Sequence, residues 1–547
     1  MRSRIQEIRR ALDSREFDYL GRDAESGWLR FDGMLVADSA EIRVEVRVDP
    51  LGIAVPKVRL KALPESLKGV LTPHLGRGEL CYLANDSVVL NVFDPAGQVL
   101  TCLDRAQGVL GQLARGELTR DAADEFFAYW GNPTPLYFAD ISPKATGYCE
   151  ALNLARVGAK GVFALTDDPE RTSRKLKSIG LIPKGGGPRV VRIGTQVSPQ
   201  PLAGPWPPRN VESLLGWQSQ LDPQCVRAIG KALTKAQKRK HQALLCLITC
   251  PRLMYGFKVE FEARPKFQRG MRRKAVDRRA LLAKSQVTPF TVIRIDDDYI
   301  ARRSAPGLAA LGERRIALVG CGTVGGYLAD LLVKAGAGTA GGELRLVDKD
   351  SLAPGNVGRH RLGFNSVLKN KARALADELT RGAPSANVLF AEDDATTIKL
   401  SRLDLLIDAT GDEALGHWLA DAVRSAFVPT LSVWVEGPGI AVRALLRDAE
   451  NAACLRCLND AARVPLYPVT NEEMPSELAG HGCESLYVPF PATVSLHAAC
   501  LAAEMVTAWA NGSPRPLLRT RIVAPGFSAG TIDVDPTKLK GCPACGT

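Results

Sequence analysis

Hydrophobic and polar positions along the first 135 residues follow a helical period, then a strand period, then a helical period again. Apolar residues in 41–48 alternate with charged ones, which is typical of a half-buried strand. The pattern predicts, in chain order, a helix over 5–12, strands over 27–36, 41–48 and 56–60, and helices over 97–113 and 119–130. This order of elements indicates an α+β domain over residues 1–135.

Residues 136–300 carry weaker signals. Proline and glycine are frequent from 182 to 210, which predicts a loop or linker there. Strand-like runs at 243–249 and 255–261 predict a strand pair, so we interpret this segment as a middle α/β linker domain of unknown role. Three of its cysteines are predicted to be small core residues rather than reactive groups: Cys225, Cys246 and Cys250.

From Arg314 onward the pattern becomes strand, glycine-rich turn, helix and strand. A buried parallel strand is predicted at 315–320, and later strands at 343–348 and 403–408. The first strand leads directly into the glycine-rich turn, whose glycines are Gly320, Gly322 and Gly325. These features indicate a doubly wound, Rossmann-like α/β domain over residues 301–547.

The chain has 71 basic and 59 acidic residues, a net charge of +12, and much of the excess lies in 231–241 and 264–284. A basic patch can bind nucleic acid or an acidic protein surface, and it can equally be a solvated face. Because no nucleic-acid-binding module accompanies the patch, we predict no specific nucleic acid partner.

The sequence also bears on the compartment. No apolar run reaches the roughly 18 residues of a membrane span, and the charged N-terminus lacks the apolar core of a secretory signal. Thirteen cysteines without a signal peptide favour a reducing compartment with metal-bound and catalytic thiols. We therefore expect a cytoplasmic protein with no membrane partner.

Two C-x-x-C motifs lie near the end of the chain, Cys454 with Cys457 and Cys542 with Cys545. Each pair can place two thiolates on one metal ion, and two pairs complete a tetrahedral four-sulfur Zn²⁺ site. Such a closed site is structural, because no coordination position remains for a substrate. The alternative is a chance occurrence of both motifs in a chain with many cysteines.

The glycine-rich turn suits a nucleotide. Its glycines allow backbone N–H groups at the positive end of a helix to approach phosphate, and Asp348 ends the next strand, where it can accept from ribose hydroxyls. These two features alone also fit a nicotinamide dehydrogenase. The amide and cations that follow, Asn356, Arg359 and Lys371, instead suit an enzyme that attacks a nucleotide α-phosphate, where the transition state gathers negative charge.

Residues 300–547 resemble ubiquitin-activating enzymes and their bacterial relatives in thiamine and molybdopterin synthesis, the ThiF and MoeB type. Members share the glycine-rich loop, a D-x-D strand end, a downstream S-N-x-x-R and a K-A helix start. The matching positions here are Asp348, Asp350, Asn356, Arg359 and Lys371, with Gly355 in place of the serine. The resemblance implies that Asp348 holds the ribose of ATP and that Asn356, Arg359 and Lys371 contact its phosphates.

The same resemblance extends to other positions. Asp412 stands where the family has an aspartate that helps to hold Mg²⁺, although one residue is inserted before it here. Arg302 and Arg303 resemble arginines that the family uses near the triphosphate; the alternative is a pair of exposed linker charges. Members usually form homodimers through this domain, so the resemblance implies a homodimer.

Cys483 lies in an irregular, polar-flanked segment that leads into a small-residue helix. In the family the corresponding segment carries the cysteine that attacks the acyl-adenylate, so the resemblance implies that Cys483 is the catalytic thiol. A thiolate suits this step because it is nucleophilic and forms a thioester that still reacts with thiols and amines. Cys321 and Cys500 are predicted to be packing residues.

The first domain resembles the ubiquitin-conjugating fold, in which an H-P-N turn and a G-x-x-C-L loop follow a strand meander. Cys81 falls at the position of the thioester cysteine, and His74 stands where the family has the asparagine that stabilises the oxyanion. Cys102 is the alternative thiol, because Thr101-Cys-Leu-Asp104 also matches a C-L-D motif. Both cysteines could instead be structural.

A conjugating-like domain ahead of an activating-like domain resembles bacterial fusions of antiphage operons such as CBASS. The resemblance implies ATP-dependent adenylation of the C-terminus of a ubiquitin-like protein or a cGAS-like nucleotidyltransferase. Cys483 and then Cys81 would carry the acyl group as a thioester, and a lysine of a protein target would receive it. The alternatives are a sulfur-carrier-protein adenylyltransferase without conjugation and a non-catalytic scaffold.

Overall fold

The structure is a computed structural model. It describes residues 2–546 apart from 39, 68–71, 77, 84–86, 119–120, 122–125, 131–133, 140–148, 157–158, 202–205, 263–277, 425–426, 476–477 and 481–486. The chain divides into two compact units, one of residues 1–136, 146–151 and 187–293, the other of residues 137–145, 152–186 and 294–547. No helix in the described part of the chain is both long and apolar enough to cross a membrane.

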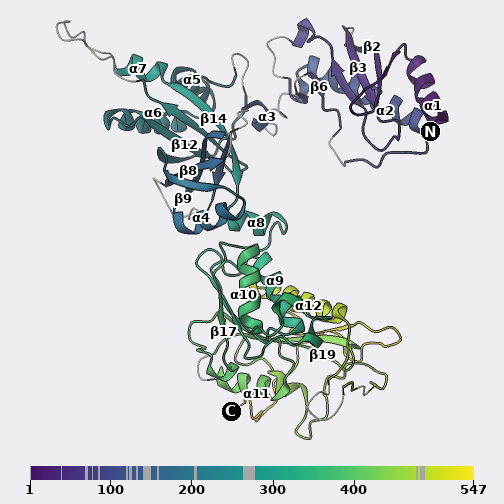
Figure 1. Cartoon of the computed structure of the whole chain (residues 1–547), viewed down its shortest axis with the longest axis vertical. Coiled ribbons are helices and arrows are strands. Elements are labelled where there is room, and N and C mark those ends of the chain that lie inside the picture. Colours follow the sequence, from purple (N-terminus) through teal and green to yellow (C-terminus); the bar gives the residue numbers. More distant parts are fainter. Residues whose placement is uncertain are drawn as a thin grey trace. The chain divides into compact units, whose positions relative to one another are not determined.

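The N-terminal part of the first unit is an antiparallel sheet with two helices packed on it (Figure 1). The sheet order is β1-β2-β3-β4-β6-β5, and the elements are α1 (Arg2–Asp13), β1 (Asp18–Arg22), β2 (Leu29–Ala37), β3 (Ala40–Val48), β4 (Lys57–Leu60), β5 (Leu75–Gly76), β6 (Glu79–Leu80) and α2 (Pro95–Ala114). Asp94 caps α2 by accepting from the Gly97 amide at 2.8 Å, and Pro95 occupies its first turn. The α+β prediction for this region is confirmed.

The middle of the chain contributes strands to both units. The first unit holds α3 (Phe126–Trp130), β11 (Arg189–Gly194), α5 (Val211–Leu221), α6 (Pro223–Lys238), β12 (Ala243–Thr249), β13 (Met254–Glu260), α7 (Arg278–Lys284) and all but the last residue of β14 (Gln286–Arg294). The second holds β9 (Ala159–Thr166), α4 (Pro169–Ser178), β10 (Ile182–Gly186) and α8 (Asp297–Arg303), whereas β7 (Pro135–Phe138) and β8 (Glu150–Arg156) cross the division. Cys225, Cys246 and Cys250 are buried, as predicted for core residues.

The predicted loop over 182–210 is wrong at its start, because 182–194 forms β10 and β11. β11 pairs in parallel with β12, with Val190 opposite Leu245, and Val190 is fully buried. Pairing with a strand that lies some 50 residues later in the chain stabilises β11, so local proline and glycine signals could not reveal it. The predicted helix over 119–130 is described as a helix only over α3; 119–120 and 122–125 lie outside the described residues.

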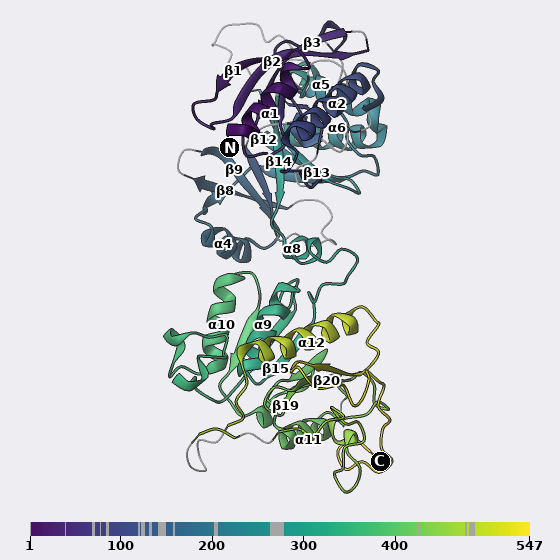
Figure 2. The same cartoon turned by 90° about the vertical axis from the view of Figure 1, so that its right-hand side faces the viewer.

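The C-terminal part is a doubly wound sheet, as predicted. Its elements are β15 (Arg315–Val319), α9 (Thr323–Lys334), β16 (Glu343–Val347), α10 (Lys371–Gly382), β17 (Val388–Ala391), β18 (Leu405–Asp408), α11 (Glu413–Ala422), β19 (Thr430–Glu436), β20 (Ala441–Arg447), α12 (Ala492–Ala510) and β21 (Leu518–Ile522). The order is β17-β16-β15-β18-β19-β20-β21, parallel through β19 and antiparallel beyond. Figure 2 shows α9, α10 and α12 on one face and α11 on the other.

Strand register brings the functional loops of this sheet together. Val319 at the end of β15 lies opposite Val347 of β16 and Asp408 of β18. The carboxyl ends of these three parallel strands therefore meet at one edge, which is where ligands bind in open α/β sheets.

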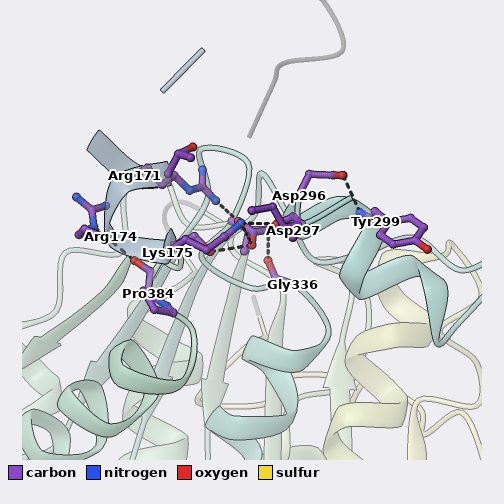
Figure 3. A network of polar contacts seen from close by, with 12 residues as sticks. Arg171, Arg174, Lys175, Asp296, Asp297, Tyr299, Gly336 and Pro384 are labelled. Carbon is purple, nitrogen blue, oxygen red and sulfur yellow. Dashed lines mark hydrogen bonds and ion pairs between the residues drawn. The ribbon is translucent and has the colours of Figure 1, made fainter. Parts of the chain in front are cut away.

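A buried polar cluster fastens α4 and α8 to the loop before β17 within the second unit (Figure 3). The carboxylate of Asp297 accepts from Lys175 Nζ at 2.8 Å, from Arg171 Nη2 at 2.5 Å and from Ser385 Oγ at 2.7 Å. Arg174 Nε donates to the carbonyl of Pro384 at 3.4 Å. We call Asp297, Lys175, Arg171 and Ser385 the Asp297 cluster.

Candidate functional site

A cleft of about 600 Å³ opens at the carboxyl ends of β15, β16 and β18. Gly320, Gly322, Asp348, Asp350, Arg359, Lys371 and Asp412 all line it. Seven residues predicted from sequence to bind a nucleotide are thus brought to one place by the fold. Gly325 lies one turn into α9 and is buried.

The glycine-rich turn is shaped by close backbone contacts. Gly320 has a φ of +84°, in the left-handed region that favours glycine, and α9 begins after Gly322 without a side-chain cap. A Cβ on Gly325 would lie 1.8 Å from the carbonyl oxygen of Gly320. The amides of the first turn of α9 therefore face the cleft without competing side chains, an arrangement that suits phosphate.

Asp348 and Asp350, which follow β16, also line the cleft. Asp348 accepts from the amides of Cys321 at 2.7 Å and Asp350 at 2.9 Å, which fixes its carboxylate beside the glycine-rich turn. Lys371 Nζ lies 3.0 Å from Asp350 Oδ2 and is only 14% exposed. α10 begins at Lys371 and is capped by Asn370, whose side chain also donates to the Asp348 carbonyl at 2.8 Å. Carboxylates and a cation thus lie side by side in the cleft.

Arg359 enters the cleft from the segment before α10. Its Nη1 donates to the Val488 carbonyl at 3.0 Å, and its guanidinium lies 4.3 Å from the ring centre of Phe490. Burial lowers the pKa of Arg359, although arginine remains charged at neutral pH. Asn356 is not among the cleft-lining residues; its side-chain oxygen accepts from the Ala353 amide at 3.2 Å.

The end of β18 and the turn that follows it carry two further carboxylates. Asp408 accepts from the Thr410 amide and hydroxyl at 3.0 and 2.6 Å, and burial raises the pKa of Asp408. Asp412 caps α11 by accepting from the Leu415 amide at 3.0 Å while it lines the cleft. A carboxylate in this place is a hard oxygen ligand of the kind that Mg²⁺ prefers, so Asp412 fits a metal beside phosphates.

A second chamber of about 560 Å³ adjoins the cleft and shares Gly411, Asp412, Val433 and Trp434 with it. Sequence reasoning missed this chamber. It contains Arg443 of β20, a buried arginine whose Nη1 lies 3.7 Å from Glu436 and whose Nε donates to Thr520 at 3.2 Å. The Nη2 of Arg443 has no hydrogen-bond partner among the described residues, and burial lowers the pKa of this side chain.

Cys454, Cys457, Cys542 and Cys545 converge in a buried cluster with all four Sγ atoms within 4.8 Å of one another. Three Sγ–Sγ separations are 3.8, 3.8 and 3.5 Å. A tetrahedral Zn²⁺ with bonds of about 2.3 Å would hold its sulfurs about 3.8 Å apart. The Leu539 amide also donates to Cys457 Sγ at 3.5 Å, as expected around a thiolate ligand. The four thiols therefore fit a structural zinc ion.

In the first unit, Cys81 follows β6 and is exposed. It borders a groove of about 960 Å³ with largely apolar walls, which include Trp28, Val55, Leu83 and Leu90. Cys102 is buried inside α2, and burial raises the pKa of its thiol. Of the two alternatives, only Cys81 presents its sulfur where another molecule can reach it.

His74 lies beside Cys81 through the backbone. The Cys81 amide donates to the His74 carbonyl at 2.6 Å, and the His74 Nε2 lies 3.0 Å from Asp121 Oδ2. His74 has a φ of +65°, a conformation that asparagine adopts more readily than most residues.

The other residues predicted from the sequence have different outcomes. Cys483 lies outside the described residues, so the structure gives it no position. Arg302 and Arg303 lie in α8, where Arg302 pairs with Asp298 at 2.6 Å, and neither lines the cleft. Cys321 is buried, as predicted. The prediction that Cys500 packs is wrong: it is exposed on α12, because the buried side of that helix is formed by other residues, among them Ala498, Ala499 and Leu501.

Comparisons with known proteins find matches for both the N-terminal and the C-terminal domain. Residues 298–541 match the ThiF family, and residues 38–139 match prokaryotic E2 family B. Over 544 residues the chain is 44% identical to the ATP-dependent ubiquitin transferase-like protein Cap2 of Pseudomonas aeruginosa (strain BWHPSA011 / Pa011), covering 99% of this chain and 98% of that protein. These matches confirm the resemblance stated for the two domains.

More distant proteins are also similar. The Cap2 protein of Escherichia coli (strain TW11681) is 25% identical over 512 residues, covering 87% of this chain and 86% of that protein. A crystal structure of E. coli MccB with MccA-N7isoASN aligns with a TM-score of 0.34 and 17% identity, covering 43% of this chain and 68% of that chain.

Proposed function

From the premise that the chain belongs to the family of ATP-dependent ubiquitin transferase-like Cap2 proteins, we propose that it adenylates the C-terminus of another protein and transfers the acyl group to a target amine. The chain is a ligase–transferase with an activating-like and a conjugating-like domain. The observation that carries the proposal is the cleft in which Asp348, Arg359 and Lys371 surround the glycine-rich turn.

In the first step, a terminal carboxylate oxygen of the modifier attacks the α-phosphorus of ATP, and the bond to pyrophosphate breaks. Negative charge grows on the phosphoryl oxygens in the transition state. Cations that are already in place, such as Lys371 and Arg359, would stabilise this charge. Asp348 would accept from the ribose hydroxyls, because its carboxylate is held at the end of β16. Mg²⁺ neutralises phosphate charge when bound, and Asp412 with Asp350 would hold it.

The second chamber suits the tail of the modifier. It opens into the nucleotide cleft at Gly411 and Asp412, so a chain end lying in it would direct its carboxylate toward the phosphates. Arg443 lines this chamber, so its positive charge would attract the carboxylate end of a tail that lies there.

Two thioester steps follow. The Cys483 thiolate attacks the carbonyl carbon of the acyl-adenylate, and AMP leaves. The Cys81 thiolate then attacks the Cys483 thioester, which releases the Cys483 thiolate. A target lysine amine attacks the Cys81 thioester, loses a proton and forms an isopeptide bond as the Cys81 thiolate leaves. The modifier would be a ubiquitin-like protein or a cGAS-like nucleotidyltransferase, within a cytoplasmic antiphage system such as CBASS, and the enzyme would work as a homodimer.

The proposal is tested by adding candidate modifiers, each with its own C-terminus intact or shortened by one residue, to the full chain with ATP. We expect pyrophosphate release only with the intact C-terminus, and a thioester on the enzyme that dithiothreitol removes. Cys81→Ala should retain pyrophosphate release and lose the product linked to the target lysine, with Cys102→Ala as the matched control.

The outcomes separate the alternatives. A sulfur-carrier-protein adenylyltransferase would release pyrophosphate and depend on neither Cys81 nor Cys102. A non-catalytic scaffold would release none with any candidate, including one shown by pull-down to bind the chain.

A further inference from the structure

α6 carries a row of cations along one face. Four basic side chains are spaced three or four residues apart, which places them on the same side of the helix, and all are exposed: Arg227, Lys231, Lys235 and Lys238. The opposite face packs into the core of the first unit through Cys225, Ile229, Leu233 and Ala236. The row therefore projects from a helix that is firmly held.

Neighbouring elements extend this row. Arg189 of β11 lines a shallow depression together with Lys235 and Arg239. α7 lies against α6 (Figure 1), where Gln237 Nε2 donates to the Arg278 carbonyl at 3.1 Å. We call the exposed cations of these three elements and of the turn after α6 the basic face: Arg189, Arg227, Lys231, Lys235, Lys238, Arg239, Lys240, Arg278, Arg279 and Lys284.

Along α6, the part of the basic face that the structure describes in full, the features of a protein-binding surface are absent. Residues 223–241 contain no aspartate or glutamate. The remaining exposed residues of α6, all of which the structure describes, are Pro223, Gln224 and Thr234, so the helix presents no aromatic or aliphatic anchor. Protein interfaces are built around such anchors, whereas phosphate contacts need only cations and polar groups.

We propose that the basic face binds the phosphate backbone of nucleic acid without reading its sequence. From Arg227 to Lys238 the row extends about 16 Å at 1.5 Å per residue, which equals the rise of about five base pairs along the axis of a duplex at 3.4 Å each. Because the sequence carries no recognisable base-reading module, the proposal is limited to contacts with phosphates. The inference goes beyond the proposed function, because α6 belongs to neither the nucleotide cleft nor the Cys81 groove.

The test measures binding of the full chain to a fluorescein-labelled 20-base-pair DNA of arbitrary sequence by anisotropy, from 50 to 200 mM salt. With four to six phosphate contacts, log K should fall against log salt with a slope of about −3.6 to −5.4. The triple variant R227Q/K231Q/K238Q should lower affinity at least tenfold and reduce the slope by about 2.7. A second sequence of equal length should bind equally well.

The matched control R381Q/K334Q/K399Q removes the same three charges from exposed positions of the second unit and should leave affinity and slope near those of the unsubstituted chain. Circular dichroism confirms that both variants fold. The proposal is overturned if the unsubstituted chain does not bind at 50 mM salt, or if both variants lose affinity equally. Tighter binding of polyglutamate than of DNA would overturn it too, in favour of an acidic protein.

Discussion

At the residue scale, burial distinguishes two cysteines that the sequence offered as alternative thioester residues. Cys81 and Cys102 both stand in motifs that resemble a thioester cysteine, yet Cys102 is 5% exposed and its thiol pKa is raised by burial, whereas Cys81 is exposed. A thiol attacks as its thiolate, so a raised pKa and a buried sulfur both oppose catalysis. Burial also distinguishes Lys371, which is only 14% exposed and lies in the cleft, where we propose that it contacts phosphate.

Lys371→Met should lower the rate of adenylation by about 100- to 1,000-fold, because one fixed group that stabilises transition-state charge is worth that much in other enzymes. Asp350, 3.0 Å away and 60% exposed, can be solvated by water once the lysine is lost, so the fold should remain intact. ATP–pyrophosphate exchange measures the rate, and thermal unfolding checks the fold.

The control for this substitution is Lys334→Met on α9, where the lysine is 70% exposed and its pairing with Asp330 is at 3.8 Å. We expect it to leave exchange unchanged. An equal loss in both variants would contradict a role for Lys371 in the cleft.

At the element scale, the site depends on turns that tolerate little change. The amides at the start of α9 can face a phosphate only because Gly320 adopts a left-handed backbone and Gly325 packs against its carbonyl. The cluster of four cysteines likewise depends on two turns that lie close together, one between Cys454 and Cys457 and one between Cys542 and Cys545. Short motifs were enough to predict both features, since each motif fixes local geometry and chemistry together.

Gly325→Ala should weaken ATP binding at least tenfold. Its Cβ would meet the backbone oxygen of Gly320 at 1.8 Å, and no side-chain rotation can relieve that contact, so the turn must move. Overpacking of this kind costs about 1–3 kcal/mol. Gly382→Ala at the end of α10 meets nothing within 4 Å and should bind ATP normally. Titration calorimetry measures both, and equal affinities would contradict the proposed geometry of the turn.

Cys542→Ser should remove the metal and destabilise the C-terminal part of the chain. We expect about one zinc per purified chain by mass spectrometry, almost none in the variant, and a loss of at least about 2 kcal/mol in unfolding free energy. Cys500→Ser alters an exposed cysteine outside the cluster and should retain both metal and stability. Full metal content in the Cys542 variant would show that the four thiols do not form one site.

At the scale of the whole molecule, the sequence predicted features that lie within short local motifs. It did not predict features that depend on contacts between segments far apart in the chain. The strands and turn that carry Gly320 and Asp348 were predictable because they follow one another along the chain. β11, which depends on β12 for its pairing, and the chamber around Arg443 were not, since each is assembled from segments with no shared local signal. The same holds for the Asp297 cluster, in which Asp297 lies more than 80 residues from each of its partners.

Asp297→Ala should destabilise the second unit by about 3–5 kcal/mol, the usual result of removing one partner from a buried ion pair. The side chains of Asp297, Lys175 and Arg171 are 14%, 11% and 16% exposed, so water cannot easily replace the lost carboxylate. The control is Asp298→Ala at the neighbouring position, which removes an exposed ion pair with Arg302. It should lower the free energy of unfolding by less than about 1 kcal/mol. Chemical denaturation of both variants measures the difference.

The pH dependence provides a separate test of the same cluster. Burial alone would raise the pKa of Asp297, but Lys175, Ser385 and Arg171 together hold it below its ordinary value. The carboxylate therefore stabilises the fold above the unfolded pKa of about 3.9, and this contribution is lost as the pH falls through the lower folded value. The stability advantage of the unsubstituted chain over Asp297→Asn should then be constant from pH 5 to 7 and shrink below about pH 4. If the advantage grew as the pH fell, the ion pairs would not be its source.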